Sequence, residues 1–182
     1  MSTKAEATIA DLAQYPGKAE LVHGELVVMS PTGGLPGYAA GEIVSSLRDF
    51  AKTQKSAFAI GDNVGFIVDL PHRRSFCPNA AYYIGSLSMD FVAGAPLFAV
   101  EVRSKGDYGT QAEKELAEKR ADYFAAGTQV VWDVDLLSAD VVRAYRADRP
   151  TAPAKFRRGE IADAEPALPG WRLAVNELFP PA

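Results

Sequence analysis

The chain has 182 residues, of which 48% are hydrophobic and 23% charged, and its formal net charge is -4. This length fits one domain with a sizeable core, and this composition is that of a globular chain and argues against disorder. The acidic balance works against nucleic-acid binding unless a local patch or a metal holds the partner.

No part of the sequence indicates a membrane segment or a thiolate metal site. No apolar run approaches the roughly 20 residues of a membrane span, and the start MSTKAEAT lacks the apolar core of a secretory signal, so we expect a cytoplasmic protein. Cys77 is the only cysteine, and the two histidines, His23 and His72, are far apart in sequence, so a zinc site is not expected. Two basic clusters, at 72–74 and 156–158, are interpreted as solvated loops rather than binding surfaces.

The first third of the chain predicts two helices and a hairpin. Residues 8–18 are typical of a short helix that ends at Pro16 and Gly17. Two short β-type runs around His23-Gly24 predict a hairpin, and residues 31–37 are turn-forming. Apolar residues recur at three- and four-residue spacing over 39–54, which predicts an amphipathic helix.

The middle of the chain predicts a βαβ unit. Strands are expected at 63–69, 80–84 and 97–102, followed by a helix with a capping box of Thr110 and Glu113 and a left-handed stop at Gly127. The apolar run at 128–135 predicts a strand parallel to, and beside, the one at 97–102, with both buried on two faces. We therefore expect a single α/β or α+β domain over 1–182, with a helical extension at 1–18 and a proline-containing, largely irregular wrap at 150–182.

One carboxylate lies inside the predicted core. Glu101 interrupts the apolar run LFAVEV, and a buried carboxylate must be paired, protonated or bound to a cation. Either the strand emerges into solvent or meets an arginine there, or Glu101 belongs to a site. Stepping back from Tyr123 by four and three residues places Lys119 and Leu116 on the sheet-facing stripe of the helix. Lys119 is thus expected either to extend past the core edge or to face Glu101.

Asn79 directly precedes the strand predicted at 80–84. Asparagine most often caps or turns the chain, and its side-chain oxygen is also a ligand for a hard cation. Both interpretations stay open at this point.

Five phrases occur in a fixed order along the chain: ELVHGELVVMSPTGG, CPNAAYY, PLFAVEVRS, EKRADYFAAGTQVVWDVD and ALPGWRLAVNELF. Together, over about residues 19–179, they resemble the Uma2 family of proposed restriction endonucleases, a branch of the PD-(D/E)XK nuclease superfamily. The resemblance implies a restriction-endonuclease-like fold, with a central mixed β-sheet flanked by helices, often as a homodimer that acts on DNA.

The resemblance also implies a metal site. In this superfamily an aspartate and a glutamate on adjacent strands hold a divalent metal, Mg²⁺ or Mn²⁺, and a lysine positions or activates the attacking water. Carried over by position, Glu101 is the strand glutamate, Asn79 stands in place of the aspartate, Lys119 in KRADYFAAG is the lysine, and Glu20 is a further carboxylate. The expected catalytic set is therefore Glu101, Lys119, Asn79 and Glu20, with Glu101 and Asn79 as metal ligands.

The amide at position 79 leaves two functions open. An amide keeps a ligand oxygen but removes a negative charge, so it weakens metal binding and the activation of water. The chain is then either a metal-dependent endonuclease impaired by Asn79, or a catalytically inactive DNA- or protein-binding dimer module. Arg103 either contacts phosphate or pairs with a carboxylate. Lys105 is interpreted as a solvated loop lysine, and contact with phosphate is the less favoured alternative.

Overall fold

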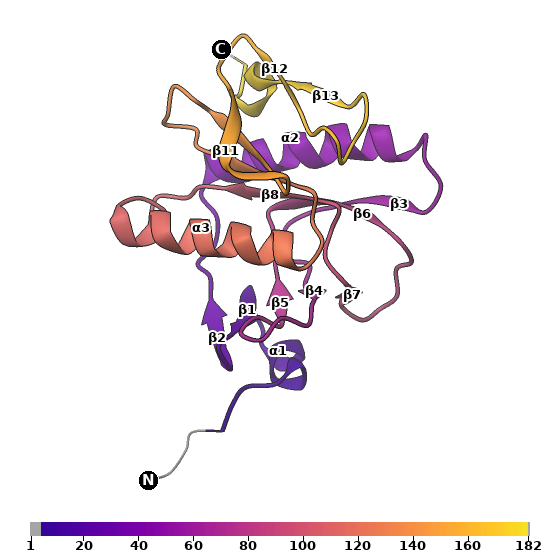
Figure 1. The fold of residues 1–182 in the computed structure, drawn as a ribbon, viewed down its shortest axis with the longest axis vertical. Helices are drawn as coiled ribbons and strands as arrows, with labels where there is room; N and C mark the ends of the chain where they lie inside the picture. The colour runs from indigo at the N-terminus through magenta and orange to yellow at the C-terminus, as the bar shows by residue number, and fades with distance from the viewer. Residues whose placement is uncertain (1–4, 182) are drawn as a thin grey trace.

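Figure 1 shows a computed structural model of the protein, which describes residues 5–181. The helices are α1 (Ile9–Gln14), α2 (Gly34–Ala51), α3 (Thr110–Ala125) and the 3-10 helix η1 (Val175–Leu178). The strands are β1 (Ala19–Val22), β2 (Glu25–Val28), β3 (Ala57–Ile60), β4 (Phe66–Ile67), β5 (Ser75–Phe76), β6 (Ala80–Ile84), β7 (Val92–Ala93), β8 (Phe98–Val102), β9 (Val130–Val134), β10 (Val142–Arg146), β11 (Arg149–Phe156), β12 (Ile161–Asp163) and β13 (Arg172–Ala174). Within the described residues, none of the helices combines the length and apolar character needed to cross a bilayer.

A mixed sheet of six strands, in the order β11-β10-β9-β8-β6-β3, forms the centre of the fold. β8 and β9 are parallel neighbours joined through α3, and the other pairs in this sheet are antiparallel. α2 covers one face of the sheet and α3 lies over the other (Figure 1). The predicted βαβ unit and the mixed sheet flanked by helices are confirmed.

The alternation of side chains along β8 separates two apolar layers. Phe98 and Val100 pack in a cluster with α2 and with residues of the C-terminal segment, including Trp171. Ala99 belongs to a second cluster, which contains Tyr123 of α3. Because successive residues of a strand point to opposite faces, Glu101 follows Ala99 onto the α3 side of the sheet.

The N-terminal elements lie at the lower end of Figure 1 and carry β1 to the same side of the sheet as α3. β1 and β2 form the predicted hairpin, which turns at His23 and Gly24 with φ angles of 51° and 69°. The N–H of Arg74 donates to the carbonyl of Leu21 at 2.9 Å, so β1 is tied to the segment before β5. The short helix also forms, as α1, with Thr8 as its cap.

Three local expectations were wrong. α3 begins at Thr110 as predicted, but its N-cap is Gly109 and no side chain caps it, because Glu113 pairs with Arg103 instead. α2 begins at Gly34, inside the stretch predicted as turn, since a proline in the first helical turn, here Pro36, costs no helical hydrogen bond. The strand predicted at 63–69 shortens to β4.

The C-terminal segment is more regular than the irregular wrap that we expected. β11 is the edge strand of the central sheet, where Pro150 and Pro153 are tolerated because the lost N–H groups need not serve a second neighbour. β12 and β13 form a separate antiparallel pair, followed by η1. Gly127, with a φ of 107°, does confirm the predicted left-handed end of α3.

Candidate functional site

Glu101 projects from β8 toward α3 and is held there by two side chains of that helix. The Tyr123 hydroxyl donates to Oε1 of Glu101 at 2.7 Å, and Nζ of Lys119 lies 2.9 Å from the same oxygen. The Glu101 side chain is 14% exposed, so it lies near the edge of the core rather than in its centre. Both contacts use Oε1, and Oε2 takes part in neither.

Lys119 and Tyr123 are one helical turn apart on α3 and therefore share a face. Tyr123 is fully buried and its ring stacks on Phe76, with centroids 4.0 Å apart. Burial raises the pKa of Tyr123 well above its ordinary value, so its hydroxyl stays a donor. Burial alone lowers the pKa of Lys119, but the charges of Glu101 and Glu20 outweigh that effect and raise it, so the ammonium is retained.

Glu20 of β1 contacts the same ammonium. Its Oε1 lies 2.8 Å from Nζ of Lys119 and accepts the backbone N–H of Cys77 at 2.8 Å, and its Oε2 accepts from Arg73 at 2.6 Å. Burial raises the pKa of Glu20, but the charges of Lys119 and Arg73 outweigh it and lower the pKa below its ordinary value. The structure thus brings Glu20, Lys119 and Glu101 together as one cluster, with the lysine between two carboxylates.

Asn79 lies beside this cluster but contacts the backbone. Its N–H donates to the carbonyl of Val100 at 3.0 Å, and its Oδ1 accepts the N–H of Val102 at 2.8 Å. Asn79 therefore bonds to the residues on both sides of Glu101. Among the described residues we find no contact of its side chain with Lys119 or Glu20.

Sequence reasoning missed Arg73 and Asp122, which extend the cluster. The guanidinium of Arg73 joins Glu20 to Asp122, with Nε 2.7 Å from Oδ2 of Asp122, and all three side chains are at most 9% exposed. Asp122 also bonds His72 at 2.8 Å. The basic cluster at 72–74 was interpreted as solvated, and this is wrong for Arg73, which is buried. The available signal was the spacing on α3, since Asp122 follows Lys119 by three residues.

The two histidines are distant in sequence but adjacent in the fold. The rings of His23 and His72 stack with centroids 5.2 Å apart. Over residues 5–181, no three acidic, histidine or cysteine side chains form a group suited to a metal ion.

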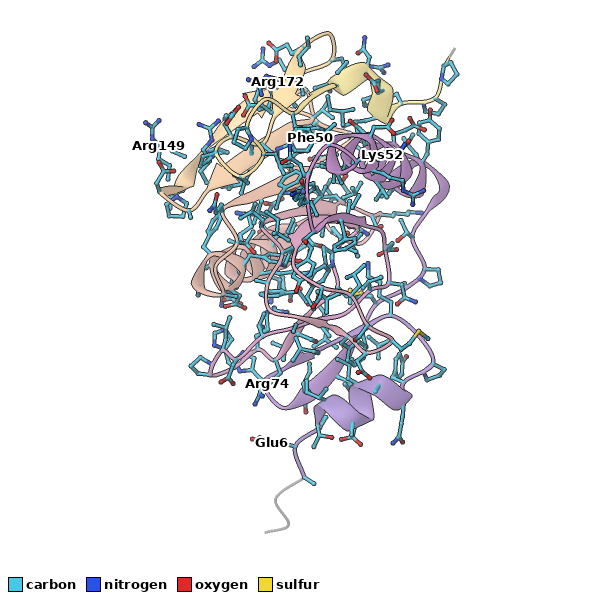
Figure 2. The ribbon with its side chains drawn as sticks, turned by 90° about the vertical axis from the view of Figure 1, so that its right-hand side faces the viewer. Glu6, Phe50, Lys52, Arg74, Arg149 and Arg172 are labelled. Atoms are coloured by element: carbon cyan, nitrogen blue, oxygen red, sulfur yellow. The ribbon has the colours of Figure 1, made fainter. Side chains whose placement is uncertain are left out.

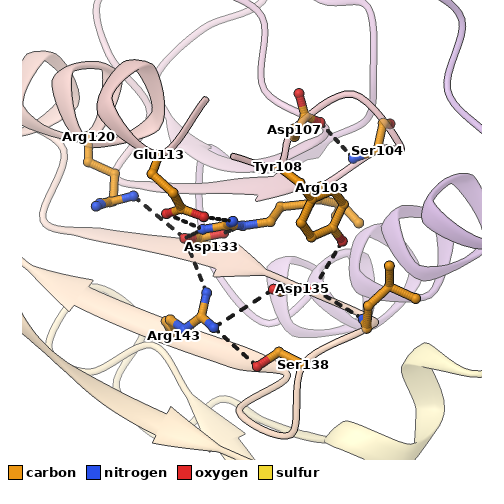
Figure 3. A network of polar contacts seen from close by, with 12 residues as sticks. Arg103, Ser104, Asp107, Tyr108, Glu113, Arg120, Asp133, Asp135, Ser138 and Arg143 are labelled. Atoms are coloured by element: carbon orange, nitrogen blue, oxygen red, sulfur yellow. Dashed lines mark hydrogen bonds and ion pairs between the residues drawn. The ribbon is translucent and has the colours of Figure 1, made fainter. Parts of the chain in front are cut away.

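A second buried network, shown in Figure 3, decides the role of Arg103. Its guanidinium donates twice to Asp133, at 2.7 Å each, and also pairs with Glu113 of α3. Hydrogen bonds with Asp133 raise the pKa of Arg103. The guanidinium of Arg103 is thus paired with carboxylates, which was one of its two interpretations, while Lys105 is exposed.

Asp133 is a second acidic residue close to Glu101 that sequence reasoning did not consider. It pairs with Glu101 in the parallel register of β8 and β9, and is 2% exposed. Both of its oxygens accept from Arg103, and Arg120 lies 3.5 Å away. A carboxylate surrounded in this way is neutralised and unsuited to hold a metal, so Asp133 is a structural residue.

The donor atoms around Glu101 are of the type that binds a hard cation, although neighbouring cations largely compensate the negative charge of the carboxylates. Glu101 has one oxygen outside its contacts with Lys119 and Tyr123, and the Asn79 oxygen accepts one N–H and keeps a second lone pair. Mg²⁺ commonly takes one or two carboxylate ligands and keeps several waters, which suits so small a donor set. Glu20, by contrast, is occupied by three partners.

Two comparisons with known proteins found similarities. A sequence model of the Uma2 family, described as "Putative restriction endonuclease", matches residues 9–176. A solved structure of "a putative nuclease belonging to DUF820" from Anabaena variabilis superposes with a TM-score of 0.74 at 18% identity, covering 94% of this chain and 97% of that one. At this identity the likeness shows a shared fold. No curated protein matches the sequence.

Proposed function

Because the chain belongs to the Uma2 family, we propose that it is an endonuclease that hydrolyses phosphodiester bonds of DNA with Mg²⁺ or Mn²⁺. The observation that carries this proposal is the cluster of Glu20, Lys119 and Glu101, which lies within the matched residues. Lys119 is 2.8 Å from one carboxylate and 2.9 Å from the other. A carboxylate can hold the metal, and an ammonium beside it can stabilise the charge that develops on the phosphate, so the cluster supports metal-assisted hydrolysis.

Each residue of the proposed site has a role that follows from its contacts. Glu101 and Asn79 would hold the metal, which supplies charge neutralisation of the phosphate and a bound water of lowered pKa. The Lys119 ammonium donates hydrogen bonds to the attacking oxygen or to the phosphate, where negative charge develops. Glu20 keeps the ammonium oriented, because its own position is fixed by Arg73 and by the N–H of Cys77.

Asn79 is the residue that separates the two candidate functions. With the amide of Asn79 as the second ligand, Glu101 is the one carboxylate of the two metal ligands. The affinity of the site for the metal is therefore lower than it would be with two carboxylates. The competing proposal is an inactive nuclease-fold module that binds DNA or a protein, for which the amide at position 79 is the supporting observation. The homodimer and the cytoplasmic location expected from the sequence stay predictions.

Nicking of supercoiled plasmid in Mg²⁺ or Mn²⁺ tests the proposal. We expect slow nicking by the wild type, faster nicking by Asn79→Asp, and none by Glu101→Ala. The matched control is Glu118→Ala, since Glu118 is 64% exposed on α3 and should not affect the rate. Nicking by Asn79→Asp alone would identify a degenerate enzyme, absence of nicking by all variants would favour the binding module, and nicking that survives Glu101→Ala would refute the site.

A further inference from the structure

The ammonium of Lys119 lies between two carboxylates, whose negative charges would also stabilise a bound metal cation. Nζ is 2.8 Å from Oε1 of Glu20 and 2.9 Å from Oε1 of Glu101. The three side chains are 13%, 5% and 14% exposed, so water screens their charges little. A divalent cation near Glu101 would be repelled by this ammonium at close range, and the repulsion is strong at the effective dielectric constant of ~20 of a protein site.

We propose that Lys119 is a built-in competitor of the divalent metal, which holds Glu20 and Glu101 in the free protein and moves to a phosphodiester oxygen when metal and DNA bind. This inference rests on the function proposed above and adds a control over metal binding to it. The lysine side chain is long and flexible enough to turn from one anion to another without a change of the backbone.

The charges of the cluster support coupled binding of metal and phosphodiester. The carboxylates of Glu20, Glu101 and Asp122 face the cations of Lys119 and Arg73, which leaves one negative charge when His72 is counted as neutral. A divalent metal alone turns this into one positive charge, and one phosphodiester group restores neutrality. The metal should therefore bind more tightly when DNA is present, and by linkage DNA should bind more tightly with the metal.

Binding of Mn²⁺, measured from the electron paramagnetic resonance of the free ion, tests the competition without any need for cleavage. We expect Lys119→Met to bind Mn²⁺ at least about tenfold more tightly than the wild type, because an adjacent charge shifts such equilibria by about one to three orders of magnitude. The control is Lys114→Met, since Lys114 is 69% exposed on the same helix. Equal affinity of Lys119→Met and wild type, or no Mn²⁺ binding by either, overturns the proposal.

A second pair of variants covers the case in which Lys119→Met does not fold. Glu20→Gln and the double variant Glu20→Gln/Lys119→Met differ in the lysine alone, and the double variant buries no unpaired Glu20 carboxylate. The double variant should bind Mn²⁺ the more tightly, again by at least about tenfold. Equal affinities would overturn the competition.

A short DNA duplex and its uncharged methylphosphonate analogue test the coupling. We expect the DNA to tighten Mn²⁺ binding by the wild type, beyond the Mn²⁺ that the DNA binds alone, and the analogue to leave it unchanged. An equal effect of both duplexes, or of neither, overturns the proposed transfer of Lys119 to phosphate.

If Lys119→Met gains affinity for Mn²⁺ but no variant nicks plasmid, the competition holds and the nuclease function falls. If plasmid is nicked but Lys119→Met gains no affinity, the nuclease function holds and the competition falls.

Discussion

Arg73 and Arg74 are adjacent in sequence but should differ strongly in their contribution to stability. The Arg73 side chain is 8% exposed and bonds two carboxylates that are 5% and 9% exposed. Arg74 is 51% exposed and lies 3.6 Å from Asp69, which is 93% exposed. Figure 2 labels Arg74 at the surface of the lower end of the molecule.

The expected difference follows from the burial of these pairs. Removal of one partner from a buried ion pair costs about 3–5 kcal/mol, because the other charge is left buried and unpaired. A surface pair is worth about 0–1 kcal/mol. For a chain of this size, ~2–4 °C of melting temperature corresponds to 1 kcal/mol, so Arg73→Ala should lower the melting temperature by about 6–20 °C and Arg74→Ala by at most about 4 °C.

Urea denaturation and thermal unfolding, followed by circular dichroism, measure both variants. Arg73→Lys is a useful third variant, because it keeps the charge but loses the guanidinium that spans Glu20 and Asp122. Its stability should lie between those of the wild type and Arg73→Ala. If Arg73→Ala and Arg74→Ala lose the same free energy of unfolding, the buried network does not stabilise the fold as argued.

Two further predictions concern charged residues of the two buried networks. The pKa of Glu20 is lowered in the folded state, so the contribution of its carboxylate to stability is complete above the ordinary pKa of 4.5 and is lost as the pH falls through the lower, folded-state pKa. The stability advantage of wild type over Glu20→Gln should therefore shrink in acid, which urea titrations at several pH values would show. An advantage that does not depend on pH would contradict this prediction. In the second network, Asp133→Asn should cost about 3–5 kcal/mol because Asp133 is 2% exposed. Glu113→Gln should cost about 1 kcal/mol or less, since its side chain is 53% exposed, and equal losses in urea would refute the distinction.

Elements with long, regular patterns could be predicted from the sequence, whereas elements defined by their neighbours could not. The apolar periodicity of α2 and the nearly continuous apolar runs of β8 and β9 each carry their own signal. β5 and β7 contain two residues each, which is too short for any periodicity. β11 contains prolines and is compatible with a sheet only because it lies at an edge, and edge position is a tertiary property.

The residues of the candidate site likewise divide into those that the sequence could predict and those that it could not. The stripe on α3 predicted that Lys119 would either extend past the core edge or face Glu101, and the structure places the charged atoms of Lys119 and Glu101 2.9 Å apart. Arg73 could not be distinguished from Arg74, because both follow a histidine in one short basic run and only the pairing of the chain with β1 decides which is buried. The catalytic roles of Glu101, Lys119, Asn79 and Glu20 stay predictions.

The attachment of α3 is compatible with the proposed transfer of Lys119 to a phosphodiester oxygen. Its buried residues among those described are Asp122 and Tyr123, so few of its apolar side chains are buried against the sheet. It is also held by charges, through Glu113 and Arg120 to the network of Figure 3 and through Lys119 and Asp122 to the site. Ion pairs, unlike apolar packing, can be exchanged for a new anion without opening a cavity. Transfer of Lys119 from carboxylate to phosphate therefore leaves the helix in place, because Arg73 and the Arg103 network still hold it.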